Sequence, residues 1–134
     1  VVLCHQQSVQ MYRFLGSVYR VTMTGVLGAH GVIPGLANVA ASAFSGAWEA
    51  GESGEEQQAR ENLASVVALQ KLLGLARGGG PNASAISGLK SALKIMGIID
   101  HDTVTQPMRP LAEEEKAQIP DLLQKARLPT LVVG

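Results

Sequence analysis

Lysine is the first residue type here that could do chemistry, because a partly desolvated lysine amine can attack a carbonyl group and form a Schiff base. The chain has five lysines, and all of them follow residue 70: Lys71, Lys90, Lys94, Lys116 and Lys125. All five fall in a second half whose spacing predicts amphipathic helices, and a lysine on the flank of such a helix is solvated. We therefore expect none of them to be a nucleophile, and no catalytic residue is assigned.

Three other groups of residues are interpreted as structural. Cys4 and His5 are neighbours at the end of a predicted strand, where the side chains of adjacent residues point to opposite faces and cannot easily hydrogen-bond to each other. Residues 100–102 (Asp-His-Asp) are consecutive in a loop, whereas a metal site needs three or four ligands that converge. Residues 78–80 (Gly-Gly-Gly) end a helix, and no Lys-Ser/Thr pair follows as in a phosphate-binding loop. We expect neither a metal nor another cofactor.

Composition narrows the function classes further. A chain of 134 residues with 46% hydrophobic and 4% aromatic residues can bury one core, built mainly from aliphatic side chains. Eleven basic residues balance eleven acidic ones, which argues against nucleic acid or an anionic membrane as a partner. No run of about 18 apolar residues predicts a spanning helix. The single cysteine fits a reducing compartment, so a cytoplasmic location is expected.

The first 51 residues predict a mixture of strands and helices. Four segments precede the first proline, in chain order: a strand at Val1–Cys4, a helix at Gln6–Tyr19, a strand at Tyr19–Thr24 and a strand at Gly31–Ile33. Pro34 and Gly35 then end the regular secondary structure, and residues 36–50 have the composition of a helix of small residues.

The rest of the chain predicts helices. Ser53 and Glu56 resemble a capping box. The apolar stripe of the helix that follows is Leu63, Val66, Val67, Leu69, Leu73 and Ala76. A second helix, capped by Asn82 or Ser84, has the stripe Ile86, Leu89, Leu93 and Met96. Residues 105–110 predict an extended, proline-fixed connector, and a last helix from about Ala112 is kinked or divided at Pro120.

Three stretches carry a resemblance to a known family. Residues 28–39 (Gly-Ala-His-Gly-Val-Ile-Pro-Gly-Leu-Ala-Asn-Val) have a G-x-x-G-x-I-S/P…A/G-N-V pattern, and residues 84–97 have a K-x-A-L-x-x-x-G helix. Residues 105–111 (Thr-Gln-Pro-Met-Arg-Pro-Leu) are similar to an R-x-P-x-x-P-L connector. In this order and spacing they resemble the C-terminal portion of the dihydrodipicolinate synthase / N-acetylneuraminate lyase family, over about residues 25–126.

The resemblance implies a helix-rich α/β fold. The family has a (β/α)8 TIM barrel followed by a helical C-terminal extension. Residues 1–51 would then be the last one or two strands of the barrel with their helices, and residues 52–134 the extension. The chain begins with Val1 rather than Met, and we expect it to be a fragment of a longer protein.

The resemblance also implies an activity. Members of the family are class I aldolases, lyases that form a Schiff base between pyruvate and a lysine on strand six, with a proton-relay tyrosine on strand five. No lysine precedes Lys71, so the strand-six position has no match and the chain alone is expected to be inactive. The alternative is a non-catalytic helical interaction or oligomerisation module derived from the family. Expected partners are pyruvate or another 2-oxo acid in the parent enzyme, and either a second copy or the remainder of the barrel.

Two residues match the family's substrate site. An isoleucine on strand eight and a glycine at the end of strand seven line the pyruvate site, and they correspond to Ile33 and Gly25. The match of Gly25 requires Tyr19–Thr24 to be strand seven, although parallel neighbours need a connection of a dozen or more residues. Strand seven is alternatively Val1–Cys4, which places His5 at the glycine position.

Overall fold

The computed structural model describes residues 14–15, 28–78 and 81–130 of the chain. It divides into two compact units, one of residues 1–37 and 41–64 and the other of residues 38–40 and 65–134. The predicted domain boundary after Gly51 falls near the end of helix α2 (Ala41–Glu52), and the division into domains stays a prediction.

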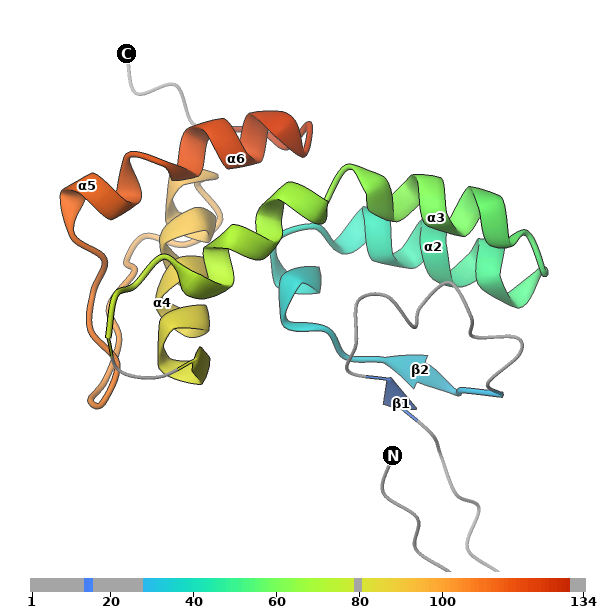
Figure 1. The fold of residues 1–134 in the computed structure, drawn as a ribbon, viewed down its shortest axis with the longest axis horizontal. Helices are drawn as coiled ribbons and strands as arrows, with labels where there is room; N and C mark the ends of the chain where they lie inside the picture. The colour runs from blue at the N-terminus through green and yellow to red at the C-terminus, as the bar shows by residue number, and fades with distance from the viewer. Residues whose placement is uncertain (1–13, 16–27, 79–80, 131–134) are drawn as a thin grey trace, which may run out of the picture. The chain divides into compact units, whose positions relative to one another are not determined.

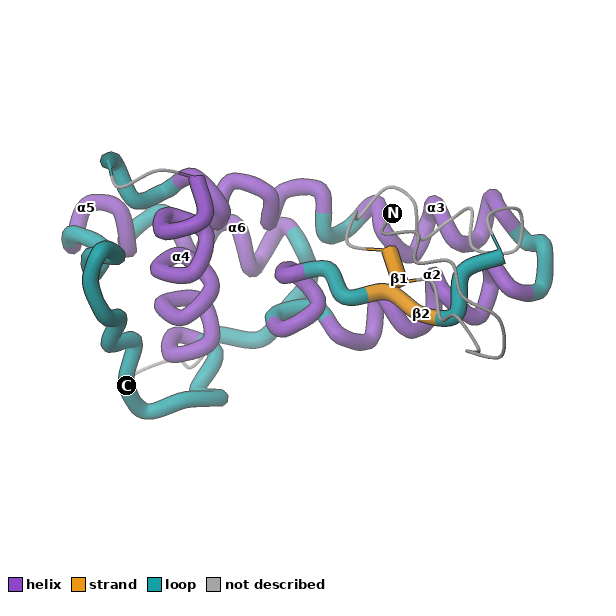
Figure 2. Tube along the Cα trace, turned by 90° about the horizontal axis from the view of Figure 1, so that it is seen from below, coloured by secondary structure: helices purple, strands orange, loops and turns teal. Residues whose placement is uncertain are grey.

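Two short parallel strands form the sheet of the first unit (Figures 1 and 2). Strand β1 (Phe14–Leu15) pairs with β2 (Gly31–Val32) in the register Phe14 to Gly31 and Leu15 to Val32. The predicted strand at residues 31–33 is therefore confirmed at its first two residues. The predicted helix at residues 6–19 is wrong at Phe14 and Leu15, because pairing with a distant segment outweighs the local spacing.

The other predictions for the N-terminal part lie outside the described residues. They are the strands at 1–4 and 19–24 and the glycine position at Gly25 or His5. The observed pairing satisfies the geometry of a parallel connection, because residues 16–30 lie between β1 and β2.

The helix predicted at residues 36–50 is divided in two. A 3-10 turn, η2 (Gly35–Asn38), begins after Pro34, whose carbonyl oxygen accepts the Ala37 N–H at 3.0 Å. Helix α2 then ends in a Schellman motif at Gly54, whose φ is +77°. The N–H of Glu55 donates to the Ala50 carbonyl at 2.8 Å, and that of Gly54 to Gly51 at 3.3 Å. The predicted capping box is therefore wrong, because Ser53 belongs to the end of α2.

Helix α3 (Glu56–Ala64) runs beside α2 in Figures 1 and 2. The buried side chains of the pair are aliphatic or aromatic, which is why two helices with many polar residues still associate: Phe44, Ala47, Ala50, Ala59 and Leu63. Gly46 allows close approach, since a Cβ there would lie 3.1 Å from Nδ2 of Asn62.

The second unit begins with a 3-10 helix, η3 (Val67–Gly74), where an α-helix was predicted. The physical reason is the spacing of its apolar residues. Val66, Leu69, Leu72 and Leu75 are all buried and recur every three residues, the period of a 3-10 helix. Val67, placed in the predicted stripe, is exposed.

Helix α4 (Pro81–Ile95) packs against η3 and against α6 (Ile119–Lys125). Its buried face is made of small residues: Ser84, Ser87, Gly88, Ser91 and Ala92. The predicted core stripe lies on the other side, where Ile86 is 43% exposed and Leu89, Leu93 and Met96 are half-buried. That part of the prediction is wrong, because the close approach to η3 selects small side chains.

The segment from 105 to 126 contains a turn and two short helices. The predicted extended connector turns at residues 105–108, where the N–H of Met108 donates to the Thr105 carbonyl at 3.0 Å and the Gln106–Pro107 bond is cis. Helix α5 (Glu113–Lys116) and α6 follow, and Pro120 lies in the first turn of α6, so the predicted division there is confirmed.

The described residues are rich in helix and contain no closed barrel. Along these residues, every helix is too short or too polar to cross a membrane.

Candidate functional site

Ile33, the predicted substrate-binding isoleucine, directly follows β2 and is 71% exposed. The carboxyl ends of parallel strands meet at one edge of a sheet, and this edge carries the site residues in barrel enzymes. Ile33 follows its strand directly, and an apolar residue at this position can contact a molecule bound at that edge.

The register identifies the residue that follows the strand paired with β2 in the sequence. Leu15 pairs with Val32, so the residue that follows each strand is Gly16 in one case and Ile33 in the other. Gly25, the predicted glycine, lies outside the described residues, as does Gly16. The length of the connection between the two strands was the signal in the sequence that could have identified β1. A strand parallel to Gly31–Val32 must end a dozen or more residues before it.

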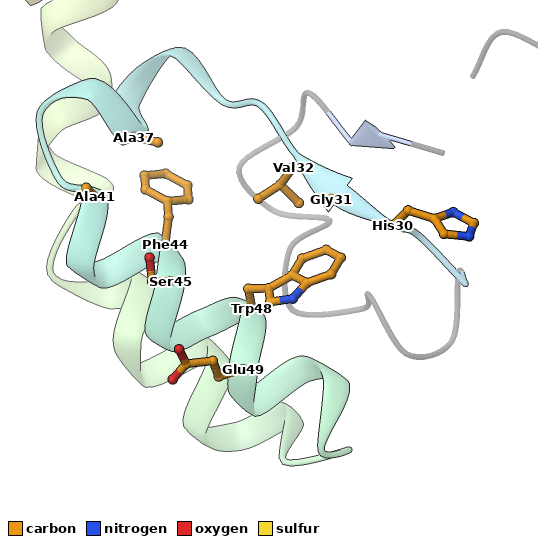
Figure 3. A pocket seen from close by; sticks show the side chains of 9 residues that line it. All are labelled: His30, Gly31, Val32, Ala37, Ala41, Phe44, Ser45, Trp48 and Glu49. Carbon is orange, nitrogen blue, oxygen red and sulfur yellow. The ribbon is translucent and has the colours of Figure 1, made fainter. Parts of the chain in front are cut away.

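A hollow of about 410 Å³ lies between β2 and α2 in the first unit (Figure 3). We call it the α2–β2 hollow. Its apolar lining includes Val32, Phe44 and Trp48, and its polar lining is His30, Ser45 and Glu49. The Val32 side chain points toward the two aromatic rings, whereas the His30 imidazole points away from them.

The two aromatic side chains of the hollow differ in burial. Phe44 is 3% exposed and belongs to the core, while Trp48 is half-buried. The polar lining residues His30, Ser45 and Glu49 are all exposed.

Most lysines are held by oxygen atoms within the second unit, and none lines the hollow. Lys90 donates to the Thr103 carbonyl at 2.6 Å. Lys94 and Lys116 each lie 3.3 Å from an Asp102 carboxylate oxygen. Lys125 lies 2.7 Å from Asp121. These contacts hold the four lysine side chains at the second unit, away from the hollow.

Asp102 has a structural environment. Its carboxylate accepts the Ser91 hydroxyl at 2.9 Å in addition to the two lysine ammonium groups. Partial burial raises the pKa of Asp102, but the hydrogen bonds from Ser91, Lys116 and Lys94 outweigh it and lower the pKa from 3.8 to about 2. Across the described residues, no group of three or more His, Cys, Asp or Glu side chains could hold a metal ion.

Glu115 is the centre of a second network, which we call the Glu115 network. Arg109 makes a bidentate pair with its carboxylate, at 2.6 and 2.8 Å. The backbone N–H groups of Arg77 and Ala112 donate to the same carboxylate at 3.1 and 2.8 Å. The hydrogen bonds from Arg109, Ala112 and Arg77 hold the pKa of Glu115 at about 2, down from 4.5. Arg109 also donates to the Arg77 carbonyl, so the network fixes the connector to the end of η3.

Three serines on the buried face of α4 also make polar contacts in the second unit. The hydroxyl of Ser84 donates to the Ala76 carbonyl at 2.9 Å and that of Ser87 to the Arg109 carbonyl at 2.7 Å. Together with the Ser91 bond to Asp102 they satisfy groups that burial would otherwise leave without partners. These contacts are structural.

Comparison with known proteins agrees with the resemblance in the sequence. The sequence pattern of the Dihydrodipicolinate synthetase family matches residues 9–126. The fold is similar to that of a dihydrodipicolinate synthase from the commensal bacterium Bacteroides thetaiotaomicron, with a TM-score of 0.74 and 24% identity. The match covers 84% of this chain and 37% of that chain, so this chain spans well under half of that enzyme. No curated protein matches the chain.

Proposed function

The chain belongs to the dihydrodipicolinate synthetase family, and we propose that it is the C-terminal part of a Schiff-base-forming lyase that condenses or cleaves pyruvate and an aldehyde. The family match over residues 9–126 carries this proposal. The place of Ile33 after a strand that pairs in parallel supports it, because that is where a barrel enzyme holds its substrate.

The roles of the residues present are binding and exclusion of water. We assign Ile33 to the wall of the pyruvate site, where an apolar side chain helps to desolvate a lysine amine and so keeps part of it neutral. Gly25 remains the predicted glycine of the site, and Gly16 is a second candidate because it follows the strand that pairs with β2.

The chain alone is expected to form no Schiff base. Its lysines all follow residue 70, and four of them donate to oxygen atoms of the second unit. The lysine and the tyrosine that the family uses belong to strands with no counterpart in the described residues. We propose a cytoplasmic location on the single cysteine and on the nature of the substrate.

Borohydride trapping with pyruvate tests this assignment. The chain by itself should give no covalent adduct in a mass spectrum, whereas a dihydrodipicolinate synthase treated in parallel should gain the mass of a reduced pyruvate adduct. An adduct on any of the five lysines would contradict the proposed inactivity.

The coding sequence upstream of Val1 provides the second test. An in-frame segment with a strand ending in a lysine is expected, and the protein that includes it should trap pyruvate on that lysine. In that protein Ile33→Asp should raise the KM for pyruvate about tenfold or more, since it puts a charge against the substrate. Val67→Asp, at an exposed residue of the other unit, is the control and should leave KM unchanged.

A non-catalytic interaction module is the second candidate function. Two exposed isoleucines favour it: Ile86 on α4 is 43% exposed, and Ile98, three residues after the end of that helix, is 59% exposed. An upstream segment without a strand-ending lysine, together with no trapping by the longer protein, would favour this function over the lyase.

A further inference from the structure

We propose that the α2–β2 hollow is a binding site for a small organic cation, a primary ammonium group carried on an aromatic or aliphatic body. The site is separate from the pyruvate site of the proposed function and takes a ligand of the opposite charge. It does not depend on the lyase activity.

The apolar part of the lining receives the body of the ligand. Val32 and Trp48 are half-buried, and the Val32 side chain points toward the rings of Phe44 and Trp48 (Figure 3). A volume of about 410 Å³ with aromatic and aliphatic walls suits a small molecule. Removal of water from these walls favours a ligand with an aromatic ring or a short alkyl chain.

The charge of the lining selects a cation. Glu49 is the one carboxylate among the described residues that line the hollow, and no lysine or arginine is among them. The ion pairs between described residues engage other carboxylates, so none of them occupies Glu49. A cation is attracted by this carboxylate and by the face of the neighbouring Trp48 indole, whereas an anion is attracted by neither.

The polar atoms of α2 indicate the kind of cation. Ser45 and Glu49 both line the hollow, and they are four residues apart on α2, so they lie on the same face of the helix. The Ser45 hydroxyl oxygen and the Glu49 carboxylate can each accept a hydrogen bond. A primary ammonium group has three N–H donors for such acceptors, whereas a quaternary ammonium group has none.

The position of the hollow on β2 separates it from the pyruvate site. Ile33 is not among the residues that line the hollow. Pro34 restricts Ile33 to an extended conformation, and neighbouring side chains of an extended chain point to opposite faces. A ligand beside Val32 therefore lies on the other side of the strand from a ligand beside Ile33, and the two should not compete.

Trp48 is the single tryptophan of the chain, so its fluorescence reports directly on the hollow. Benzylammonium, benzyl alcohol and benzoate share one ring and differ in charge, and each is titrated into the full 134-residue chain. Benzylammonium should give a saturable change and bind about fivefold more tightly than benzyl alcohol, with benzoate the weakest. Benzyltrimethylammonium should also bind more weakly than benzylammonium, because it has no N–H donor.

Glu49→Gln removes the charge and keeps the size of the side chain. It should weaken benzylammonium about fivefold and leave benzyl alcohol within about twofold. Glu52→Gln is the matched control, because Glu52 is exposed on the same helix but does not line the hollow, and it should leave both affinities unchanged. Ala41→Leu, at an exposed residue of the lining, fills part of the hollow and should weaken both ligands. Circular dichroism checks that the three variants keep their helices.

Several results would overturn the proposal. They are the absence of a saturable change, equal or tighter binding of benzoate, and equal losses in Glu49→Gln and Glu52→Gln. Pyruvate added to the titration should leave the benzylammonium affinity unchanged, and competition between the two would refute a separate site. A failure of the chain or of the longer protein to trap pyruvate bears on the lyase alone and leaves this site in place.

Discussion

Gly88 lies where the backbones of α4 and η3 come closest. A Cβ at this position would lie 1.8 Å from the carbonyl oxygen of Leu72, far inside any real contact. Glycine is therefore required here by space rather than by backbone conformation. Gly74 is different, because a Cβ built there meets nothing within 4 Å.

Gly88→Ala is expected to destabilise the second unit by about 1–3 kcal/mol, because either the helix or the Leu72 carbonyl must shift. Gly74→Ala is the control and should change stability by no more than about 0.5 kcal/mol. Urea unfolding followed by circular dichroism compares the two. Equal effects would mean that α4 and η3 are not in close contact.

Arg109 supplies the planar, bidentate half of the Glu115 network. Arg109→Lys keeps the charge but loses one of the parallel hydrogen bonds to Glu115 and the pair to the Arg77 carbonyl, so the melting temperature should fall. Lys125→Gln breaks an exposed pair with Asp121 and should leave the melting temperature nearly unchanged. A larger loss for Lys125→Gln would contradict this ranking.

At the scale of elements, α4 shows why an apolar stripe is an incomplete guide. Its sequence has two faces that could be buried, one with Ile86 and Leu93 and one with Ser84, Ser87 and Ser91. The serine face is buried because each hydroxyl finds an oxygen atom outside the helix. Those acceptors lie in segments 8, 22 and 11 residues away, so no local pattern reveals them.

A pair of substitutions tests which face of α4 is buried. Ser91→Val should destabilise the protein by about 1–3 kcal/mol, since it removes a donor from the buried side of Asp102. Ile86→Ser should cost less than about 1 kcal/mol, because the side chain is already largely exposed. The reverse order, measured by thermal unfolding, would show that the apolar stripe is the core face.

Local signals predicted several elements and missed others for identifiable reasons. The β-branched run at residues 31–33, the helix near 41–50 and the break at Pro120 follow from spacing and proline chemistry, and the structure has them. Strand β1 was missed because its pairing partner is seventeen positions away in the register Phe14 to Gly31. The 3-10 helix was missed because a stripe repeating every three residues was fitted to a period of 3.6.

The candidate site was predicted less completely than the fold. Ile33 could be selected because a motif surrounds it, and its place after β2 supports that choice. The glycine of the site could not be fixed, since its identity depends on which segment pairs with β2. That pairing is a tertiary contact that the sequence around Gly25 does not encode.

For the whole molecule, the low pKa values of the Asp102 and Glu115 carboxyl groups predict that acid destabilises the folded state. Both have a folded-state pKa of about 2, below their usual values of 3.8 and 4.5. A depressed pKa stabilises the folded state above the unfolded pKa, and this stability is lost as pH falls through the folded pKa. The free energy of unfolding should therefore decline between about pH 4.5 and pH 2.

Urea unfolding at a series of pH values measures this decline. After allowance for solvent screening, Asp102 should account for about 1 kcal/mol of it. Asp102→Asn should remove that part of the slope. An unchanged slope in Asp102→Asn would show that its carboxylate does not stabilise the folded state.

The serines of α4 also decide how freely that helix can move. Their three hydroxyls bind to the end of η3, to the connector and to the loop at Asp102. A rotation of α4 about its axis, or a shift of one residue along it, breaks all three hydrogen bonds at once. A helix with an apolar buried face could make either movement without losing a hydrogen bond. The three hydrogen bonds therefore fix both the rotation of α4 about its axis and its position along that axis. The amide groups of α4 should exchange with solvent in one cooperative opening, and the helix should not fray from its ends.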